Sequence, residues 1–577
     1  MNVLDATKPD IVRATASMES AVAPSTDPVT TEVIRHSLKS AAETMKITLR
    51  RTAFSPIIYE MIDFCCCLYN DRVELLAQAD ALPAFLGTMN FCIDGAVAAI
   101  GGPENLEPGD ILLTTWAYDT GSHAQDAAVI MPVFVNGDLV GYTAQKAHHA
   151  DNGAKAPYCS DTTDVFQEGM IFPGVKIYKA GVKDDDLFRT FVANSRLPRM
   201  SAGDLSAQIA AAQAGTVAFE AIVEKYGRET FEACVARMFD HGESIVRQAL
   251  QDLPDGRWER DWKIDGDGLT EEEVPFTVAI SISGGDIEVD VSDCAPQAAG
   301  PVNSPQPNTV SQARLAVISL VGGGESVNEG FLRPITVTTR PGTLLHPVNP
   351  APIFLYGFTG VRMVEGIHAV LVDAFPAIGR ANTGGDILPV LIWGDLGTET
   401  SWATGFDHFV GQGAGETFDG GGPLMHMAVS GIRNTPAEVI EQRYPLMIEH
   451  FELAPDSGGA GEFAGGLGIN CEYRVRKEAE MTTSIEGVDV PPYGAHGGEN
   501  ARVNGIFVTT PDGETKPYRK ITSLPLPPGS LVRVETGGGG GFGDPGGRDP
   551  EVVKEELRLG YITPEFAQTH YPQAGAK

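Results

Sequence analysis

Apolar residues recur every three or four positions in five stretches of the chain, and this spacing predicts amphipathic helices. The first stretch begins at Pro28 and runs to residue 49. The others cover residues 88–100, 204–253 with a break at Tyr226-Gly227, 311–321 and 360–374. A further short helix is expected from Asp549 onward.

Alternating or short continuous apolar runs between turn residues predict strands. They cover residues 111–115, 128–135, 139–147, 277–283, 287–291, 469–476 and 530–535. Hairpin turns are expected at Asn70-Asp71, Asn136-Gly137 and Gly284-Gly285, because Asn and Gly tolerate the positive φ angles of tight turns. We therefore expect a mixed α+β, multi-domain globular fold, with hairpin-rich sheets, helical segments and a Gly-rich, β-type C-terminal region.

The length of 577 residues corresponds to roughly four domain-sized units. We expect a flexible N-terminal tail at 1–28 and an α+β region with the candidate metal site at 29–200. A helical segment at 201–260 and an α/β region at 261–455 follow, and a Gly-rich β region with a C-terminal helix occupies 456–577. The chain has no internal repeat of about 20–50 residues, which argues against a solenoid.

The chain carries 42 Lys and Arg residues against 76 Asp and Glu residues, a formal net charge of −34. A surface this acidic repels nucleic acid and anionic lipid, so we expect neither as a partner. An anionic substrate would need a local positive feature, such as a metal ion. The N-terminal tail lacks the apolar core of a signal peptide, and no window approaches the ~20 apolar residues of a membrane span. We expect a cytoplasmic protein.

Eight cysteines are present, and none forms a CxxC pair. Three of them are adjacent at Cys65, Cys66 and Cys67, where small apolar residues predict a buried strand. A disulfide framework is unusual in so long a chain, so a reducing compartment is expected.

Histidines and aspartates gather between residues 118 and 151. His123 and Asp126 lie three residues apart, and His148, His149 and Asp151 come at the end of a predicted hairpin. Neighbouring side chains of a strand face opposite ways, so only one of His148 and His149 can reach an ion held by the first pair. Two imidazoles and one carboxylate leave coordination positions open, as in catalytic sites. An ion there would lower the pKa of bound water to about 7.

The spacing alone leaves alternatives open, because a histidine on a strand is often an ordinary core or surface residue. The same ligand set also suits non-haem iron oxygenases. Residues 537–547 include five consecutive glycines, but the chain has no GxxxxGK[ST] phosphate-binding loop. We therefore favour a tight backbone crossing there over a phosphate cradle.

Several motifs resemble those of the hydantoinase B/oxoprolinase B family and follow the family's order from about residue 28 to residue 550. They are Glu-Met-Ile-Asp-Phe (60–64), Gly-Ser-His-Ala-Gln-Asp (121–126), Ala-His-His-Ala-Asp (147–151), Phe-Gln-Glu-Gly (166–169), Gly-Asp-Leu (203–205), Asp-Ser-Gly-Gly-Ala-Gly (456–461), Gly-Gly-Leu-Gly (465–468) and Gly-Gly-Phe-Gly-Asp-Pro (540–545). Many members carry a His where this chain has Phe85, and Asn-Asp-Pro-Tyr where it has residues 115–118.

The resemblance implies that His123, Asp126 and His148 bind a divalent metal, zinc first and manganese second. It also implies a hydantoinase A-type partner subunit, in a heterodimer or heterotetramer, that binds ATP with Mg and phosphorylates a carbonyl oxygen or bicarbonate. The expected activity is ATP-dependent hydrolysis of a small cyclic amide such as a lactam, a hydantoin or 5-oxoproline, most similar to caprolactamase.

Further candidate catalytic residues are Glu60 and Asp63, which could orient water or move protons, together with His149 and Asp151. One alternative function is the subunit of a ketone carboxylase of the acetone or acetophenone type, which uses bicarbonate. Another is a non-catalytic scaffold with a structural metal. The chain is shorter than expected for the acetone carboxylase subunit, which favours the amide-hydrolysing branch.

Overall fold

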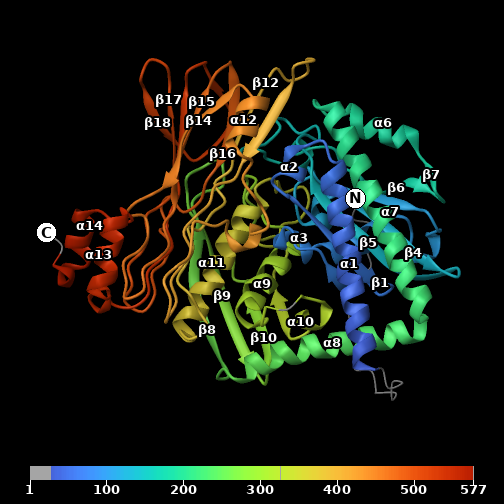
Figure 1. The fold of residues 1–577 in the computed structure, drawn as a ribbon. Coiled ribbons are helices and arrows are strands. Elements are labelled where there is room, and N and C mark those ends of the chain that lie inside the picture. Colours follow the sequence, from blue (N-terminus) through green and yellow to red (C-terminus); the bar gives the residue numbers. More distant parts are fainter. Residues whose placement is uncertain (1–26, 325, 576–577) are drawn as a thin grey trace.

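The computed structural model describes residues 27–324 and 326–575. Its helices and mainly antiparallel sheets confirm the mixed α and β class (Figure 1). The tail predicted for residues 1–28 lies outside the described residues, except for its last two. Of these, Asp27 caps helix α1 (Pro28–Thr52) by accepting hydrogen bonds from the backbone N–H groups of Val29 and Thr30.

A seven-stranded sheet occupies the N-terminal third, with the order β2-β1-β5-β4-β3-β6-β7. Asn136 and Gly137 form the predicted turn between β4 and β5, with φ angles of 55° and 90°. Strand β1 is buried along its whole length, as predicted for the cysteine run. The strands are β1 (Phe64–Asn70), β2 (Leu75–Gln78), β3 (Ile111–Thr114), β4 (Asp126–Val135), β5 (Asp138–His148), β6 (Pro173–Lys179) and β7 (Val182–Lys183).

Helices cover both faces of this sheet. The long helices α1 and α7 (Pro198–Tyr226) lie side by side over one face (Figure 1), where Cys66 joins their core. Helix α4 (Met89–Ala99) packs with Cys65 and Cys67 on the other face. Helix α8 (Arg228–Gln251) follows the predicted break at Gly227. The short helices are α2 (Pro56–Tyr59), α3 (Pro83–Leu86), α5 (Ala117–Thr120) and α6 (Asp185–Ala193).

The middle of the chain forms a four-stranded sheet with the order β11-β10-β9-β8. Its strands are β8 (Gly256–Ile264), β9 (Val274–Ser283), β10 (Asp286–Asp290) and β11 (Ile335–Thr338), and its helices are α9 (Gln306–Val321), α10 (Glu329–Leu332) and α11 (Tyr356–Ala374). Helix α11 is buried along most of its length. It lies between this sheet and the C-terminal part of the chain (Figure 1).

Two further sheets fill the C-terminal part, with the orders β13-β12-β16-β19 and β14-β15-β20-β17-β18. Strands from either side of residue 455 enter the first of them, so the last two expected regions share a sheet. The elements are β12 (Val390–Gly394), β13 (Trp402–Phe406), α12 (Ala437–Arg443), β14 (Leu446–Leu453), β15 (Ile469–Val475), β16 (Ala479–Ser484), β17 (Gly505–Thr509), β18 (Thr515–Tyr518), β19 (Lys520–Leu526), β20 (Leu531–Glu535), α13 (Pro550–Leu559) and α14 (Pro564–His570). The division into domains stays a prediction.

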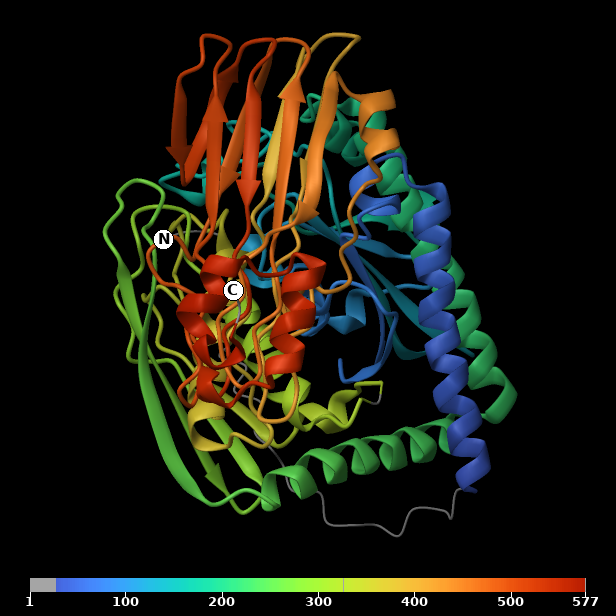
Figure 2. The same ribbon diagram turned by 60° about the vertical axis from the view of Figure 1, so that its left-hand side comes forward.

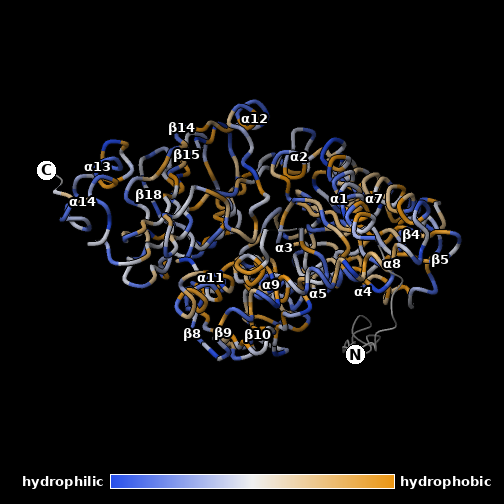
Figure 3. The backbone as a smooth tube through the Cα atoms, turned by 60° about the horizontal axis from the view of Figure 1, so that its bottom comes forward, coloured by the Kyte–Doolittle hydropathy of each residue, from blue (hydrophilic) through white to orange (hydrophobic). Residues whose placement is uncertain are grey.

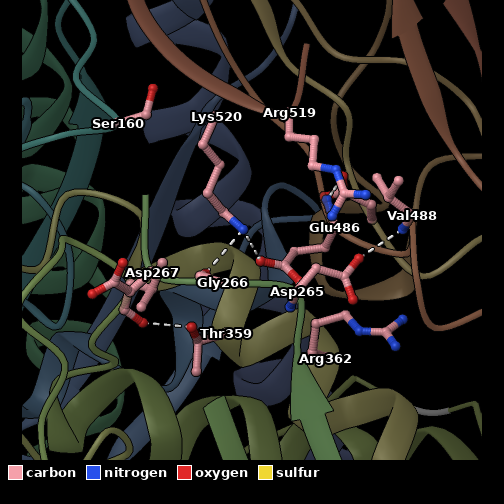
Figure 4. A network of polar contacts seen from close by, with 12 residues as sticks. Ser160, Asp265, Gly266, Asp267, Thr359, Arg362, Glu486, Val488, Arg519 and Lys520 are labelled. Atoms are coloured by element: carbon pink, nitrogen blue, oxygen red, sulfur yellow. Dashed lines mark hydrogen bonds and ion pairs between the residues drawn. The ribbon is translucent and has the colours of Figure 1, made fainter. Parts of the chain in front are cut away.

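A buried polar network joins the middle sheet to the C-terminal sheets (Figure 4). Lys520 pairs with Glu486 and donates to the carbonyl of Gly266 at 3.1 Å. Asp265 accepts a hydrogen bond from the backbone N–H of Val488 at 2.6 Å. Because the buried Lys520–Glu486 ion pair and these backbone contacts bridge the two parts, the network fixes how the two parts pack.

Glycines allow several extended segments to cross at backbone distance. The N–H of Gly539 donates to the carbonyl of Gly466, and its own carbonyl accepts from Gly459, both at 2.9 Å. A Cβ atom on Gly465 would lie 1.7 Å from the carbonyl oxygen of Gly539. The tight crossing predicted for residues 537–547 is therefore present, and larger residues would not fit.

Hydrophobic and hydrophilic residues alternate along the helices (Figure 3). Over residues 27–324 and 326–575, no helix is both long enough and apolar enough to cross a membrane. All eight cysteines are buried and free of disulfides.

Candidate metal centre

The structure brings together His123, Asp126 and His148, the three ligands implied by the resemblance. Asp126 begins β4 and His148 ends β5, and the two are direct partners across the antiparallel hairpin. Their side chains therefore lie on one face of the sheet. His123 lies in the turn between α5 and β4. His149 points to the other face, which answers the question that spacing left open.

The ligand atoms of this triad converge on one point. His123 Nε2 lies 3.1 Å from His148 Nδ1 and 3.3 Å from Asp126 Oδ2. Asp126 Oδ1 lies 2.8 Å from His148 Nδ1. An ion with bonds of about 2.0–2.1 Å separates tetrahedral ligand atoms by roughly 3.3 Å. The triad therefore fits one divalent ion and leaves coordination positions open.

Two groups at the start of α11 orient the triad from more than 200 residues away in the sequence. His123 Nδ1 donates to the carbonyl of Phe354 at 2.9 Å, so that Nε2 faces the other two residues of the triad. The hydroxyl of Tyr356 donates to Asp126 Oδ2 at 2.7 Å. Such contacts fix the orientation of metal ligands and tune their basicity.

The two neighbouring histidines also favour the ionised form of Asp126, which can bind a cation. Burial favours the neutral form of its carboxyl, but His123 and His148 outweigh burial and hold its pKa well below its usual range. The carboxylate is therefore ionised at neutral pH. A buried anion between two imidazoles is a suitable ligand for a metal ion.

A buried lysine supports the turn that carries His123. Lys146 lies on β5, two residues before His148 and on the same face. Its ammonium donates to the carbonyl of Thr120 at 2.8 Å and to the hydroxyl of Ser122 at 3.2 Å. The ring of Phe85 lies 4.1 Å from the same ammonium, so the residue that departs from the family pattern makes a cation–π contact here.

Glu168, from the Phe-Gln-Glu-Gly motif, holds the segment that orients His123. Its carboxyl accepts hydrogen bonds from the backbone N–H groups of Ile353 at 2.8 Å and Phe354 at 3.0 Å. Burial raises the pKa of Glu168 to about 8, so the carboxyl is largely protonated at neutral pH. Its contact with the triad is indirect, through the carbonyl of Phe354.

The triad opens into a cavity of about 90 Å³, which we call the metal cavity. A single water needs only roughly 10–15 Å³. The wall combines apolar side chains with a few polar groups, as in small-molecule sites. It includes Met61, Asp63, Leu82, Phe85, His123, Asp126, His148, Tyr158, Phe354, Tyr356, Leu391, Asp407, Val429 and Ile432.

Two carboxyl groups, Asp63 and Asp407, face the metal cavity in addition to Asp126. Neither side chain forms a hydrogen bond or an ion pair with the residues that the structure describes. Both are half-buried, and burial raises the pKa of each to about 7. Each can therefore take up or release a proton near neutral pH.

The other expected catalytic residues lie outside the metal cavity. His149 faces α7, where its Nε2 contacts Gln208 Oε1 at 2.9 Å. Asp151 is buried in an ion pair with Arg196. Glu60 is half-buried at the end of α2. Of the four candidates, the structure brings only Asp63 beside the triad.

Sequence reasoning missed Tyr158, Phe354, Tyr356 and Asp407. These residues come from loops and element ends spread over about half of the chain. None belongs to a local pattern of ligands or acids, so no spacing rule would select them. Glu168 lies within a recognisable motif, but its position gave no indication of which backbone groups it holds.

Comparisons with known proteins agree with this geometry. A family model described as hydantoinase B/oxoprolinase matches residues 27–545. The B subunit of a putative D-/L-hydantoinase from Pseudomonas sp. strain NS671 is 30% identical over 566 residues, which cover 94% of this chain and 95% of that protein. The beta subunit of the caprolactamase from Pseudomonas jessenii is 29% identical over 560 residues, covering 94% of this chain and 96% of that protein.

Solved structures show the same fold. The crystal structure of the ATP-dependent caprolactamase from Pseudomonas jessenii matches with a TM-score of 0.88 at 27% identity, covering 95% of this chain and 96% of that one. A nucleotide-free acetone carboxylase structure matches with a TM-score of 0.86 at 18% identity, covering 94% of this chain and 79% of that one. This second likeness concerns the fold alone.

Proposed function

This chain belongs to the hydantoinase B/oxoprolinase family, and we propose that it is the metal-holding subunit of an ATP-dependent enzyme that opens cyclic amides. The observation that carries the proposal is the convergence of His123, Asp126 and His148 at a buried cavity with two further carboxyl groups on its wall. The relatives named as hydantoinase and caprolactamase subunits support the substrate class.

The partner is an ATP-binding subunit of the hydantoinase A type. Two relatives of matching length are themselves named as parts of an assembly, one as a B subunit and the other as a beta subunit. The sequence also lacks a GxxxxGK[ST] loop. The division of labour places phosphorylation in the partner and hydrolysis in this chain.

An amide carbonyl is a poor electrophile because its nitrogen donates electrons into it. Phosphorylation of the oxygen converts the amide into an activated imidate. One water then adds to the carbon, the ring C–N bond breaks and the nitrogen takes a proton. A second water releases phosphate, so that the product is a linear amino acid or N-carbamoyl compound.

The residues of the metal cavity have separate roles in this proposal. His123, Asp126 and His148 hold a divalent ion, zinc first and manganese second, since both suit imidazole and carboxylate ligands. That ion supplies a Lewis acid and lowers the pKa of water to about 7. Asp63 and Asp407 accept the proton of the attacking water and return it to the ring nitrogen.

The apolar part of the cavity wall suits the methylene groups of a lactam. Met61, Leu391 and Ile432 add hydrocarbon surface to the wall of the same cavity that the polar triad lines. Burying such groups contributes about 25 cal/mol per Å² of apolar area. A ring with one polar edge and one apolar edge therefore matches the mixed lining of the metal cavity.

The test is to purify this chain together with its A-type partner and to screen lactams, hydantoins and 5-oxoproline for ring opening. Ring opening that requires ATP, both subunits and the bound metal supports the proposal. Carbon fixation from bicarbonate without ring opening would favour the carboxylase alternative. Full activity after loss of the triad would favour the scaffold. Substantial ATP turnover by this chain alone would refute the division of labour.

A further inference from the structure

A second, larger cavity of the described chain lies on the other side of one wall of the metal cavity, and we call it the arginine cavity. It has a volume of about 690 Å³. Its lining includes four cationic side chains and one carboxyl group, although the whole chain is strongly acidic. These charged residues are Lys46, Arg50, Arg314, Arg433 and Asp80.

Several segments line both cavities with neighbouring residues. Ile62 faces the arginine cavity, whereas Met61 and Asp63 face the metal cavity. Within each of the segments 81–87, 311–315 and 429–433, some residues likewise face the arginine cavity and their neighbours face the metal cavity. Only one layer of chain therefore separates the two spaces. Two of the elements that line the arginine cavity are α1 and α9, which Figure 2 draws in blue and in yellow-green.

Two of the arginines have no counter-charge within the described part of the chain. Arg50 Nε donates to the carbonyl of Tyr59 at 2.9 Å, and the backbone N–H of Arg433 donates to the carbonyl of Met61 at 2.9 Å. Both residues are thus tied to the same short segment before β1. Among residues 27–324 and 326–575, no carboxylate pairs with either guanidinium. By contrast, Lys46 has Glu43 at 3.4 Å.

We propose that the arginine cavity binds a small phosphate-bearing molecule beside the metal centre. A guanidinium presents a planar set of donors that matches the oxygens of a phosphate group. Unpaired arginines in an acidic chain favour an anion at this place, and the cavity has room for a ligand larger than phosphate itself. That the ligand is the phosphorylated cyclic amide, or the phosphate released from it, rests on the proposed function.

The test measures binding of inorganic phosphate and of acetyl phosphate to the full chain by titration calorimetry. Acetyl phosphate represents an activated organic substrate, and inorganic phosphate represents the product. We expect saturable binding of at least one of them. The Arg50→Gln/Arg433→Gln double variant should weaken binding by roughly tenfold or more, as loss of charge-assisted hydrogen bonds does. Tighter binding of acetyl phosphate identifies the activated substrate as the ligand, and tighter binding of phosphate identifies the product.

Two control variants make the outcome decisive. Arg51→Gln removes an equally exposed arginine next to Arg50 that does not line the cavity, and it should bind both probes as the wild type does. His148→Ala should also retain binding, because the phosphate would lie outside the metal cavity. Wild-type affinity in the double variant, or loss of binding in His148→Ala, would overturn the inference.

The single variant Arg433→Gln repeats the test at an exposed residue, where a folding defect is not expected. Failure of ring opening by the two-subunit complex would count against the proposed function only. Arginine-independent phosphate binding would count against this site only.

Discussion

Removing one hydroxyl group tests whether the buried triad is a metal site. Tyr356 donates a hydrogen bond of 2.7 Å to Asp126 Oδ2, and Tyr356→Phe deletes this bond while keeping the ring. A hydrogen bond to a charged group contributes about 1.5–3 kcal/mol. At about 1.4 kcal/mol per factor of ten, the variant should bind its metal roughly 10–100-fold more weakly.

The assay is competition for the metal between the protein and a chelator of known affinity, read out as bound metal per chain. The matched control is Tyr158→Phe. Tyr158 is also a buried tyrosine of the metal cavity, and its ring lies 5.9 Å from that of His123. Its hydroxyl bonds to none of the three triad residues, so its removal should leave metal affinity unchanged.

The comparison between the two variants distinguishes a specific loss of support for a metal ligand from a general disturbance of the cavity. If Tyr356→Phe retains wild-type metal affinity, the hydroxyl does not support a metal ligand and the reasoning is wrong. Equal losses in both variants would also refute it, because a general effect on the cavity would then explain the result. Ring opening by the complex at limiting metal should fall in parallel with affinity.

Three further outcomes follow from other parts of the structure. His123→Ala or Asp126→Ala should reduce ring opening by more than roughly 100-fold, because each removes a ligand outright; the circular dichroism spectrum should stay near wild type, and retained turnover after metal loss would argue against the mechanism. Burial raises the pKa of Glu168 from 4.5 to about 8, so the folded chain holds a proton that the unfolded chain releases, and this residue lowers stability as the pH rises through that window. The side chain of the Glu168→Gln variant is neutral at every pH, so its melting temperature should fall less than that of the wild type between about pH 5 and pH 8. If the melting temperatures of both proteins change equally with pH, the assignment is wrong. Gly465→Ala should cost about 1–3 kcal/mol or more by overpacking, measured by denaturant unfolding, whereas Gly421→Ala, where the added Cβ meets no atom within 4 Å, should not.

Local patterns were sufficient for the elements that carry the triad. Helical spacing predicts α1, and the Asn136-Gly137 signal predicts the β4–β5 hairpin, because both depend on residues close in sequence. The alternation of side chains along a strand also predicts that His148 and His149 face opposite sides of the sheet. It does not predict which of the two faces Asp126, because that depends on the pairing of Asp126 with His148 across the hairpin.

The rest of the site depends on contacts between distant segments. Phe354 and Tyr356 meet the triad only because the chain before α11 and the start of that helix reach it from the middle of the sequence. Asp407 reaches the metal cavity from the end of β13. These residues are common types in ordinary sequence surroundings. Their roles follow from tertiary packing, which a single sequence without structural context does not encode in any local spacing.

The strongly acidic composition raises the question of how the protein would bind a negatively charged substrate, and the structure suggests an answer. A chain of net charge −34 repels a phosphorylated substrate at long range. A local positive feature is therefore needed, and the sequence suggested only the metal ion. The structure adds Arg50 and Arg433, which lie across one wall from His123 and His148. Because the two sets of groups share that wall, an anion held by the arginines would lie next to the metal cavity without entering it.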